Sequence, residues 1–184
     1  MGQSASRCSE DEYLNPTSFP NVPFAQHRVG DVYLVTYTSS PSSLDPTTNL
    51  DYHYTIVIDV AGESSSFPRG LELYLGVQGE SRVVRLCQER LKHPRINYRS
   101  HQAIGKIQNI YHQGKPRQWS DGIRDIVGNE WFPEFVNKRG NILNHQCNSH
   151  QFAKYLIKYF DLDWPNYIYV AGDWDQNEPL MVDL

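Results

Sequence analysis

Residues 53–59 read His-Tyr-Thr-Ile-Val-Ile-Asp, and they decide the fold that the sequence predicts. Their β-branched and aromatic side chains are typical of a β-strand. Successive side chains of a strand point to opposite faces, so the stretch has two faces of different composition. One face carries His53, Thr55, Val57 and Asp59, and the other carries Tyr54, Ile56 and Ile58.

Two further strands flank this one. Residues 31–37 are rich in valine and tyrosine and predict a strand, followed by a Pro/Ser/Thr-rich loop at 38–50. Residues 71–75 predict a third strand, which ends at Gly76 and Gly79 and pairs antiparallel with the second if a hairpin joins them. The first half of the chain therefore predicts a small antiparallel meander.

The second half of the chain favours helices. Apolar residues recur at helical spacing in 83–91 and 103–111, and most clearly in 147–160. Residues 114–128 predict a loop with at most one helical turn. Strands followed by helices indicate the α+β class, with a small antiparallel sheet packed against helices.

The length and composition set the domain organisation. The chain has 184 residues, enough for one compact domain but not for two. Residues 1–28 are rich in Ser, Asn and Pro, which predicts a polar, partly disordered leader. The single domain then spans 29–184, and from Trp164 it continues as an extension with one expected strand at 167–170.

The charge and motif content exclude several functions. The net charge is −4 and the basic residues are scattered, so nucleic-acid binding is not expected. No glycine-rich phosphate loop or His-Glu-x-x-His motif occurs. His145, Cys147 and His150 lack the second cluster of a structural zinc site. We therefore expect neither a cofactor nor a metal.

The cysteines and the amino terminus bear on location. Cys8, Cys87 and Cys147 form no CxxC pair, and no apolar leader or membrane span occurs, so a cytoplasmic protein is expected. Residues 1–8, Met-Gly-Gln-Ser-Ala-Ser-Arg-Cys, fit myristoylation of Gly2, with Cys8 close enough for palmitoylation. Two acyl chains would hold the protein on the cytoplasmic face of a membrane. The alternative, an incidental polar leader, stays open.

Cys147 is the expected nucleophile. A thiol at a helix amino terminus has a lowered pKa, because backbone N–H groups and the helix dipole favour the thiolate, and Asn148 or Ser149 can cap this helix. The expected base is His53, because an imidazole titrates near the working pH and its strand can fix its orientation. For His145 and His150, which flank the thiol, a local role at the thiol and simple capping or packing both stay open.

Two short motifs resemble those of a known enzyme family. Residues 141–149, Asn-Ile-Leu-Asn-His-Gln-Cys-Asn-Ser, are similar to the cysteine motif of the permuted papain-fold (PPPDE) peptidases, also called desumoylating isopeptidases. Residues 53–58 are similar to the histidine strand of that family. The resemblance implies a permuted papain-like core in which Cys147 attacks and His53 acts as its base.

The Gly-Asp pair at 30–31 and the His53 strand also resemble, more weakly, those of the lecithin-retinol acyltransferase-like proteins, and a weaker similarity extends to NlpC-type proteins. The acyltransferase-like proteins use a second histidine, where this chain has Tyr74 or a neighbouring residue, so the resemblance implies the two-residue Cys/His dyad of the peptidase family. The chain departs from the peptidase and the acyltransferase-like families after the cysteine. Both families place a phenylalanine soon after it, whereas here the two residues at 150–151 come first.

The resemblance also assigns roles around the nucleophile. Gln146 and the backbone N–H of Cys147 would donate to the oxyanion, with Asn148 and His145 as supporting residues. The implied activity is that of a cysteine peptidase, isopeptidase or thioesterase, which acts through an acyl-enzyme on a protein substrate such as a ubiquitin-like conjugate or an acylated protein. The alternatives are an acyltransferase that uses the same intermediate and an inactive, membrane-tethered binding protein on the same scaffold.

Overall fold

The computed structural model describes residues 19–38, 52–107 and 114–165. These residues form one five-stranded antiparallel sheet with helices packed on it, so the predicted α+β class is confirmed. The elements in chain order are η1 (Gln26–Arg28), β1 (Asp31–Thr38), β2 (Tyr52–Ile58), β3 (Gly70–Gln78), β4 (Val83–Leu91), β5 (Tyr98–Lys106), α2 (Pro116–Ile126), η2 (Val127–Trp131), α3 (Phe132–Arg139) and α4 (Ser149–Tyr159).

The sheet has the strand order β4-β3-β2-β1-β5. The first four strands form a meander, and β5 returns to pair with β1 at the opposite edge. Residues 92–97, which link β4 to β5, must therefore cross the sheet. A flat sheet of five strands places its edge strands about 19 Å apart. The link can span at most about 24 Å, so it has little slack.

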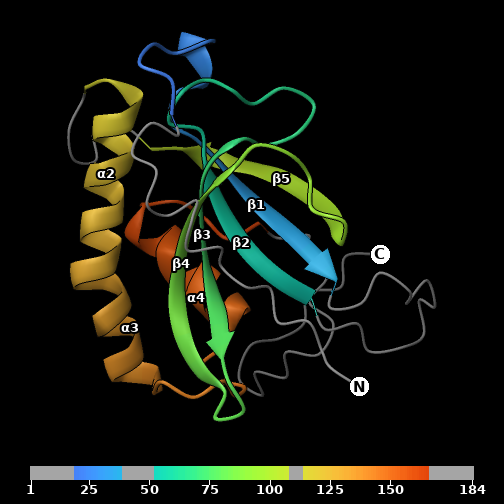
Figure 1. Cartoon of the computed structure of the whole chain (residues 1–184), viewed down its shortest axis with the longest axis vertical. Helices are drawn as coiled ribbons and strands as arrows, with labels where there is room; N and C mark the ends of the chain where they lie inside the picture. Colours follow the sequence, from blue (N-terminus) through green and yellow to red (C-terminus); the bar gives the residue numbers. More distant parts are fainter. Residues whose placement is uncertain (1–18, 39–51, 108–113, 166–184) are drawn as a thin grey trace.

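One face of the sheet, called the inner face below, packs against helices. Ile56 and Ile58 of β2 share an apolar cluster with Phe152 and Leu156 of α4, and each of these side chains is at most 1% exposed. Figure 1 shows α4 behind the sheet and the α2–α3 segment along its β4 side. Burying each such side chain stabilises the fold by about 2 kcal/mol. The inner face holds the larger of the two apolar clusters.

The opposite face, called the outer face, is crossed by the chain itself. In Figure 1 the 92–97 link passes in front of the sheet, on the side away from α4. Tyr37 of β1 is the register partner of His53. Because paired residues share a face, His53 lies on the outer face with Tyr37. A smaller apolar cluster lies there as well, made of Val35, Tyr37, Val57, Phe67 and Leu91.

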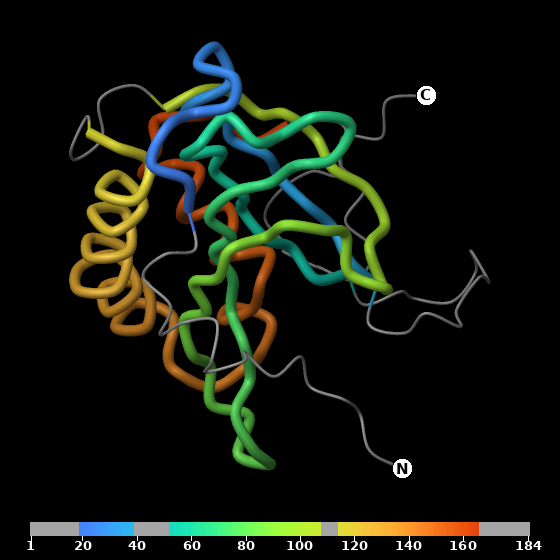
Figure 2. Tube along the Cα trace, turned by 45° about the horizontal axis from the view of Figure 1, so that its top comes forward, coloured from blue at the N-terminus to red at the C-terminus, as the bar shows by residue number. Residues whose placement is uncertain are grey.

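The segments α2, η2 and α3 run without a break and form one helical rod, which Figure 2 shows as a single coil beside the sheet. η2 is one turn of π-helix, and the N–H of Phe132 after it donates to the carbonyl of Val127. The Gln88 side chain of β4 donates from Nε2 to the carbonyl of Arg124 at 3.1 Å. This bond attaches the rod to the edge strand.

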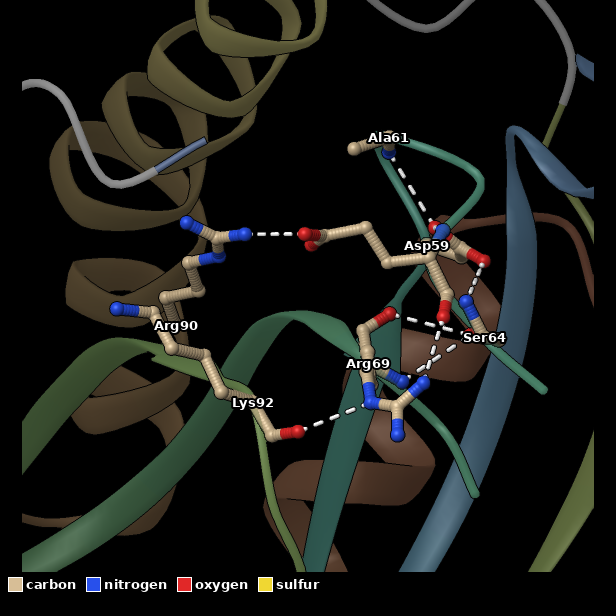
Figure 3. Close-up of polar contacts among 7 residues, drawn as sticks. Asp59, Ala61, Ser64, Arg69, Arg90 and Lys92 are labelled. Carbon is tan, nitrogen blue, oxygen red and sulfur yellow. Dashed lines mark hydrogen bonds and ion pairs between the residues drawn. The ribbon is translucent and has the colours of Figure 1, made fainter. Parts of the chain in front are cut away.

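The loop between β2 and β3 is organised by the buried carboxylate of Asp59, drawn in Figure 3. The carboxylate accepts backbone N–H groups of Ala61, Glu63 and Ser64 at 3.3, 2.8 and 2.8 Å. Three such bonds satisfy the oxygens of a buried carboxyl group. Asp59 therefore shapes this loop.

Two arginines join the loop to neighbouring segments (Figure 3). Arg69 donates from Nη1 to the carbonyl of Glu63 at 3.1 Å and from Nε to the carbonyl of Lys92 at 3.0 Å. Arg90 of β4 forms an ion pair with the Glu63 side chain. The beginning of the 92–97 link is thereby held against the loop.

Four of the predicted elements are confirmed. The strands expected at 31–37, 53–59 and 71–75 correspond to β1, β2 and β3, and the helix expected at 147–160 corresponds to α4. The antiparallel pairing of the second and third strands is also confirmed.

Three other predictions were wrong. Residues 83–91 form β4 rather than a helix, and residues 103–106 of the second expected helix belong to β5. A few apolar positions can fit both periods, and pairing with a neighbouring strand decides between them. The expected loop at 114–128 contains α2, because Pro116 stands at the first position of this helix, where proline lacks only an N–H that the helix does not use.

Part of the expected leader belongs to the domain. Phe19 is 5% exposed and lies in the inner cluster, where the guanidinium of Arg90 lies 5.0 Å from its ring centroid. The expectations for residues 1–18, for most of the 38–50 loop and for a strand at 167–170 fall outside the described residues.

Candidate functional site

Cys147 lies just before α4, where the sequence predicts a nucleophile. Asn148 is the N-cap of this helix, and its Oδ1 accepts the N–H of Gln151 at 2.9 Å. The amino terminus of α4 therefore lies beside Cys147, as expected. The thiol itself is closed off from solvent, because Cys147 is 0% exposed and belongs to the inner cluster.

The surroundings of the thiol favour its neutral form. Its Sγ donates a hydrogen bond to the carbonyl oxygen of Gly140 at 3.1 Å. Burial raises the pKa of the Cys147 thiol, and the positive charge of Arg139 offsets this only in part. A thiol with a raised pKa is protonated at neutral pH and reacts slowly as a nucleophile.

In the turn before Cys147, backbone N–H groups that could stabilise an oxyanion already donate hydrogen bonds within the protein. Oδ1 of Asn144 accepts the backbone N–H groups of Gln146 at 2.7 Å and of Cys147 at 3.0 Å. The N–H of Asn144 donates in return to the carbonyl of Cys147 at 3.0 Å. The predicted oxyanion donor at Cys147 is thus part of a closed turn, and Gln146 is exposed to solvent.

The two flanking histidines have different environments. His145 is exposed, and its carbonyl accepts Nδ2 of Asn148 at 2.9 Å. His150 is buried, with its ring centroid 5.2 Å from that of Tyr54 and 4.9 Å from that of Trp164. These are the contacts of capping and packing residues.

His53 lies on the outer face, where its ring meets the ring of Tyr74 edge-on at 5.5 Å between centroids. Burial, together with the positive charge of Arg95, lowers the pKa of His53 from 6.5 to about 4. At neutral pH the imidazole is therefore uncharged. Its environment is that of a half-buried, uncharged ring against an aromatic side chain rather than that of a base beside a thiol.

The structure does not assemble the predicted dyad. Tyr54, the residue after His53, faces α4, and its backbone N–H donates to Oγ of Ser149 at 3.2 Å. Because side chains alternate along β2, the imidazole points away from the helix that follows Cys147. The thiol bonds to a backbone carbonyl and the imidazole contacts a tyrosine, so no hydrogen bond joins the two in the part of the chain that the structure describes.

A polar network that the sequence analysis missed lies beside His53. Hydrogen bonds connect side chains from four strands and from the 92–97 link. We call this group the outer-face network; its members are Tyr37, Thr55, Glu72, Tyr74, Glu89 and Arg95.

Glu72 is the centre of the outer-face network and is 0% exposed. Its Oε1 accepts the hydroxyls of Tyr37 at 3.0 Å and Thr55 at 2.8 Å. Its Oε2 accepts the guanidinium of Arg95 at 2.6 Å. Burial raises the pKa of Glu72, whereas the charge of Arg95 and the two hydroxyls lower it. The ion pair and hydroxyls thus satisfy a carboxylate that burial would otherwise disfavour.

The sequence contains part of the pattern behind this network. Glu72 and Tyr74 share a face of β3 by the two-residue period of a strand. Only the register, in which Glu72 lies between Val57 and Glu89, brings the carboxylates and hydroxyls together. The expected helix at 83–91 placed Glu89 on the wrong kind of element, which hid the network.

The remaining predicted features concern metals and membranes. Within the three described ranges, no three His, Cys, Asp or Glu side chains are grouped so that they could hold a metal ion. No helix in the same part of the chain has the length and apolar character needed to cross a bilayer. The predicted acylation sites Gly2 and Cys8 lie outside the described residues.

No protein-family model, curated protein or solved structure matches the chain.

Proposed function

We propose that the chain is a non-catalytic binding protein built on a permuted papain-like scaffold. The scaffold is supported by the order of its parts, since the strand with His53 precedes the helix that follows Cys147 and touches it through Tyr54 and Ser149. The observation that supports a lack of catalysis is that the side chains of Cys147 and His53 lie on opposite sides of β2. A nucleophile without a base in hydrogen-bond reach gains no activation from it.

We further propose that acylation of Gly2 and Cys8 holds the protein on the cytoplasmic face of a membrane. The support is the acceptor pattern of residues 1–8. A Gly2→Ala variant, which lacks the myristoyl acceptor, is expected to leave the membrane fraction of fractionated cells. Retention of this variant on membranes would contradict the proposal.

The second candidate function is a cysteine hydrolase for isopeptide or thioester bonds of proteins, or an acyltransferase with the same acyl-enzyme. The observation that favours it is the capped amino terminus of α4 beside Cys147. For this function the ring of His53 must reach the thiol from the other face of β2. The two candidates therefore differ in the reactivity of one thiol.

Alkylation of Cys147 by iodoacetamide at pH 7.5, followed by peptide mass spectrometry, separates the candidates. In the binding protein, Cys147 reacts at least about tenfold more slowly in the native chain than in the denatured chain, because it is buried and its pKa is raised. His53→Ala leaves this slow rate unchanged. His101→Ala, which removes another outer-face histidine, is the matched control.

The hydrolase makes the opposite prediction. Cys147 then reacts faster in the native chain than in the denatured one, and His53→Ala slows it while His101→Ala does not. That result would replace the binding protein with the enzyme.

A further inference from the structure

Arg95 occupies a cage formed by the rest of the outer-face network. Its guanidinium carbon lies 4.8 Å from the ring centroid of Tyr74 and 5.5 Å from that of Tyr37. Its Nη2 donates to Oε2 of Glu72 at 2.6 Å and to Oε2 of Glu89 at 3.1 Å. Carboxylates and aromatic faces are the groups that recognise a guanidinium.

The strands, rather than the occupant, hold this cage in shape. The hydroxyls of Tyr37 and Thr55 fix Oε1 of Glu72 at 3.0 and 2.8 Å. The hydroxyl of Tyr74 fixes Oε1 of Glu89 at 3.1 Å. Each carboxylate therefore has one oxygen held by strand hydroxyls and the other directed at the guanidinium. We call the five residues around Arg95 the guanidinium cage; they are Tyr37, Thr55, Glu72, Tyr74 and Glu89. The cage is preorganised for a cation of this shape.

The occupant comes from a segment outside the strands. Arg95 belongs to the 92–97 link, whose neighbouring residue Ile96 is 92% exposed. Hydrogen bonds hold the two ends of the link, at the carbonyl of Lys92 and at the side chain of Asn97, and the backbone carbonyl of Arg95 accepts the N–H of Tyr98 at 2.9 Å. Between these ends, Arg95 is the side chain that reaches into the cage. The guanidinium can thus leave the cage without breaking a strand.

We infer that the guanidinium cage is a docking point for an arginine side chain of a protein partner, and that Arg95 is its resident occupant in the free chain. The inference rests on the proposed binding function and names the chemistry of its partner. Arg95 and the incoming arginine compete for one site. The apparent affinity for the incoming arginine is therefore its intrinsic affinity multiplied by the fraction of molecules in which Arg95 has left the cage. Removing the resident side chain removes this competition. A lysine ammonium lacks the planar fork and binds more weakly.

The test is a titration of Arg95→Ala with N-acetyl-arginine-N-methylamide, followed by NMR chemical shifts and by thermal unfolding. We expect saturable binding at least about tenfold tighter than to the wild-type chain, and a rise in melting temperature with ligand concentration. Both effects are lost when Glu72→Gln is added to Arg95→Ala. N-acetyl-lysine-N-methylamide binds at least about fivefold more weakly.

Arg90→Ala is the matched control, because Arg90 also pairs with a carboxylate and lies over an aromatic ring. It is expected to gain no arginine binding. If Arg95→Ala fails to fold, Arg95→Met keeps the apolar length of the side chain and is titrated in its place. In the wild-type chain the ligand is expected to speed amide hydrogen exchange in residues 92–97.

The inference is overturned if neither Arg95 variant binds the ligand saturably and the ligand leaves exchange in the wild-type link unchanged. Arg95 would then be an internal ion-pair partner only. This failure is separate from that of the proposed function. Slow alkylation of Cys147 without arginine binding would rule out the docking point and leave the binding-protein proposal standing. Fast, His53-dependent alkylation with arginine binding would rule out the binding-protein proposal and leave the docking point standing.

Discussion

The inner and outer faces of the sheet are made by the same strands but are stabilised in different ways. The inner face is apolar, and residues such as Ile56 and Phe152 gain stability from apolar burial, which is non-directional. The outer face depends on directed bonds, with Glu72 surrounded by hydroxyls and a guanidinium. Each face suits the titratable group that it holds, a neutral thiol at Cys147 and a neutral imidazole at His53.

This difference explains why the order of a histidine motif and a cysteine motif along a chain is a weak guide to catalysis. A cysteine and a histidine cooperate only when one environment serves both, with polar groups to support charge separation. Here the sheet assigns the two groups to different environments. The comparison of the two faces can be sharpened by changes on either side.

The largest effect is expected in the inner core. Phe152→Ala removes a side chain that is 1% exposed and leaves a cavity, so the free energy of unfolding should fall by about 3–5 kcal/mol. Denaturant unfolding measures it. Lys158→Ala, on the exposed side of the same helix, should change stability by less than about 0.5 kcal/mol. A loss below about 1 kcal/mol for Phe152→Ala would show that α4 does not cover the inner face as described.

The next effect tests the outer face. Arg95→Met leaves the buried Glu72 without its cation, and the free energy of unfolding should fall by about 2–4 kcal/mol. Adding Glu72→Gln removes the unpaired charge, so the double variant should be more stable than the sum of the single losses by at least about 1 kcal/mol. Additive losses in this double-mutant cycle, measured by denaturant unfolding, would mean that the two side chains do not interact.

A third effect depends on pH. The pKa of His53 is lowered from 6.5 to about 4, so the neutral ring stabilises the fold fully above pH 6.5, and this stability is lost as the pH falls toward 4. The loss should reach about 2–3 kcal/mol at pH 4. His53→Gln should remove this part of the pH dependence, which denaturant unfolding at several pH values measures. His93→Gln, in the exposed part of the link, should leave the wild-type pH dependence in place.

The smallest effect concerns the end of α4 that meets the inner face. Asn148→Ala removes the cap on the N–H of Gln151, and the free energy of unfolding should fall by about 1 kcal/mol. Asn148→Asp keeps an accepting oxygen but loses the Nδ2 donor to the carbonyl of His145, so its loss should be smaller than that of Asn148→Ala without being zero. Thermal unfolding distinguishes the two, and equal stability of both variants would show that the cap contributes nothing.

Much of the inner face could be predicted from the sequence. The helical period of α4 and its cap at Asn148 or Ser149 are local properties, and so is the alternation along β2 that groups Tyr54 with Ile56. Local patterns of this kind do not depend on the rest of the chain.

The outer face could not be predicted in the same way. Both faces of β2 carry apolar residues, Val57 on one and Ile56 on the other, so alternation does not show which face a helix covers. The contacts of Glu72 join residues distant in the sequence, and they arise only from strand register and from a link that crosses the sheet. The role of Arg95 is invisible until that path is known.

The order of the elements along the chain has a consequence for synthesis of the protein. The sheet is complete once β5 ends at Lys106, but the helix that covers its inner face ends at Tyr159. At about 5–20 residues per second, a ribosome needs about 3–10 s for the residues in between. During that interval a finished sheet exposes an apolar face to the crowded cell interior. Chaperones that shield apolar surfaces are therefore expected to bind the nascent chain, and to leave it when α4 emerges.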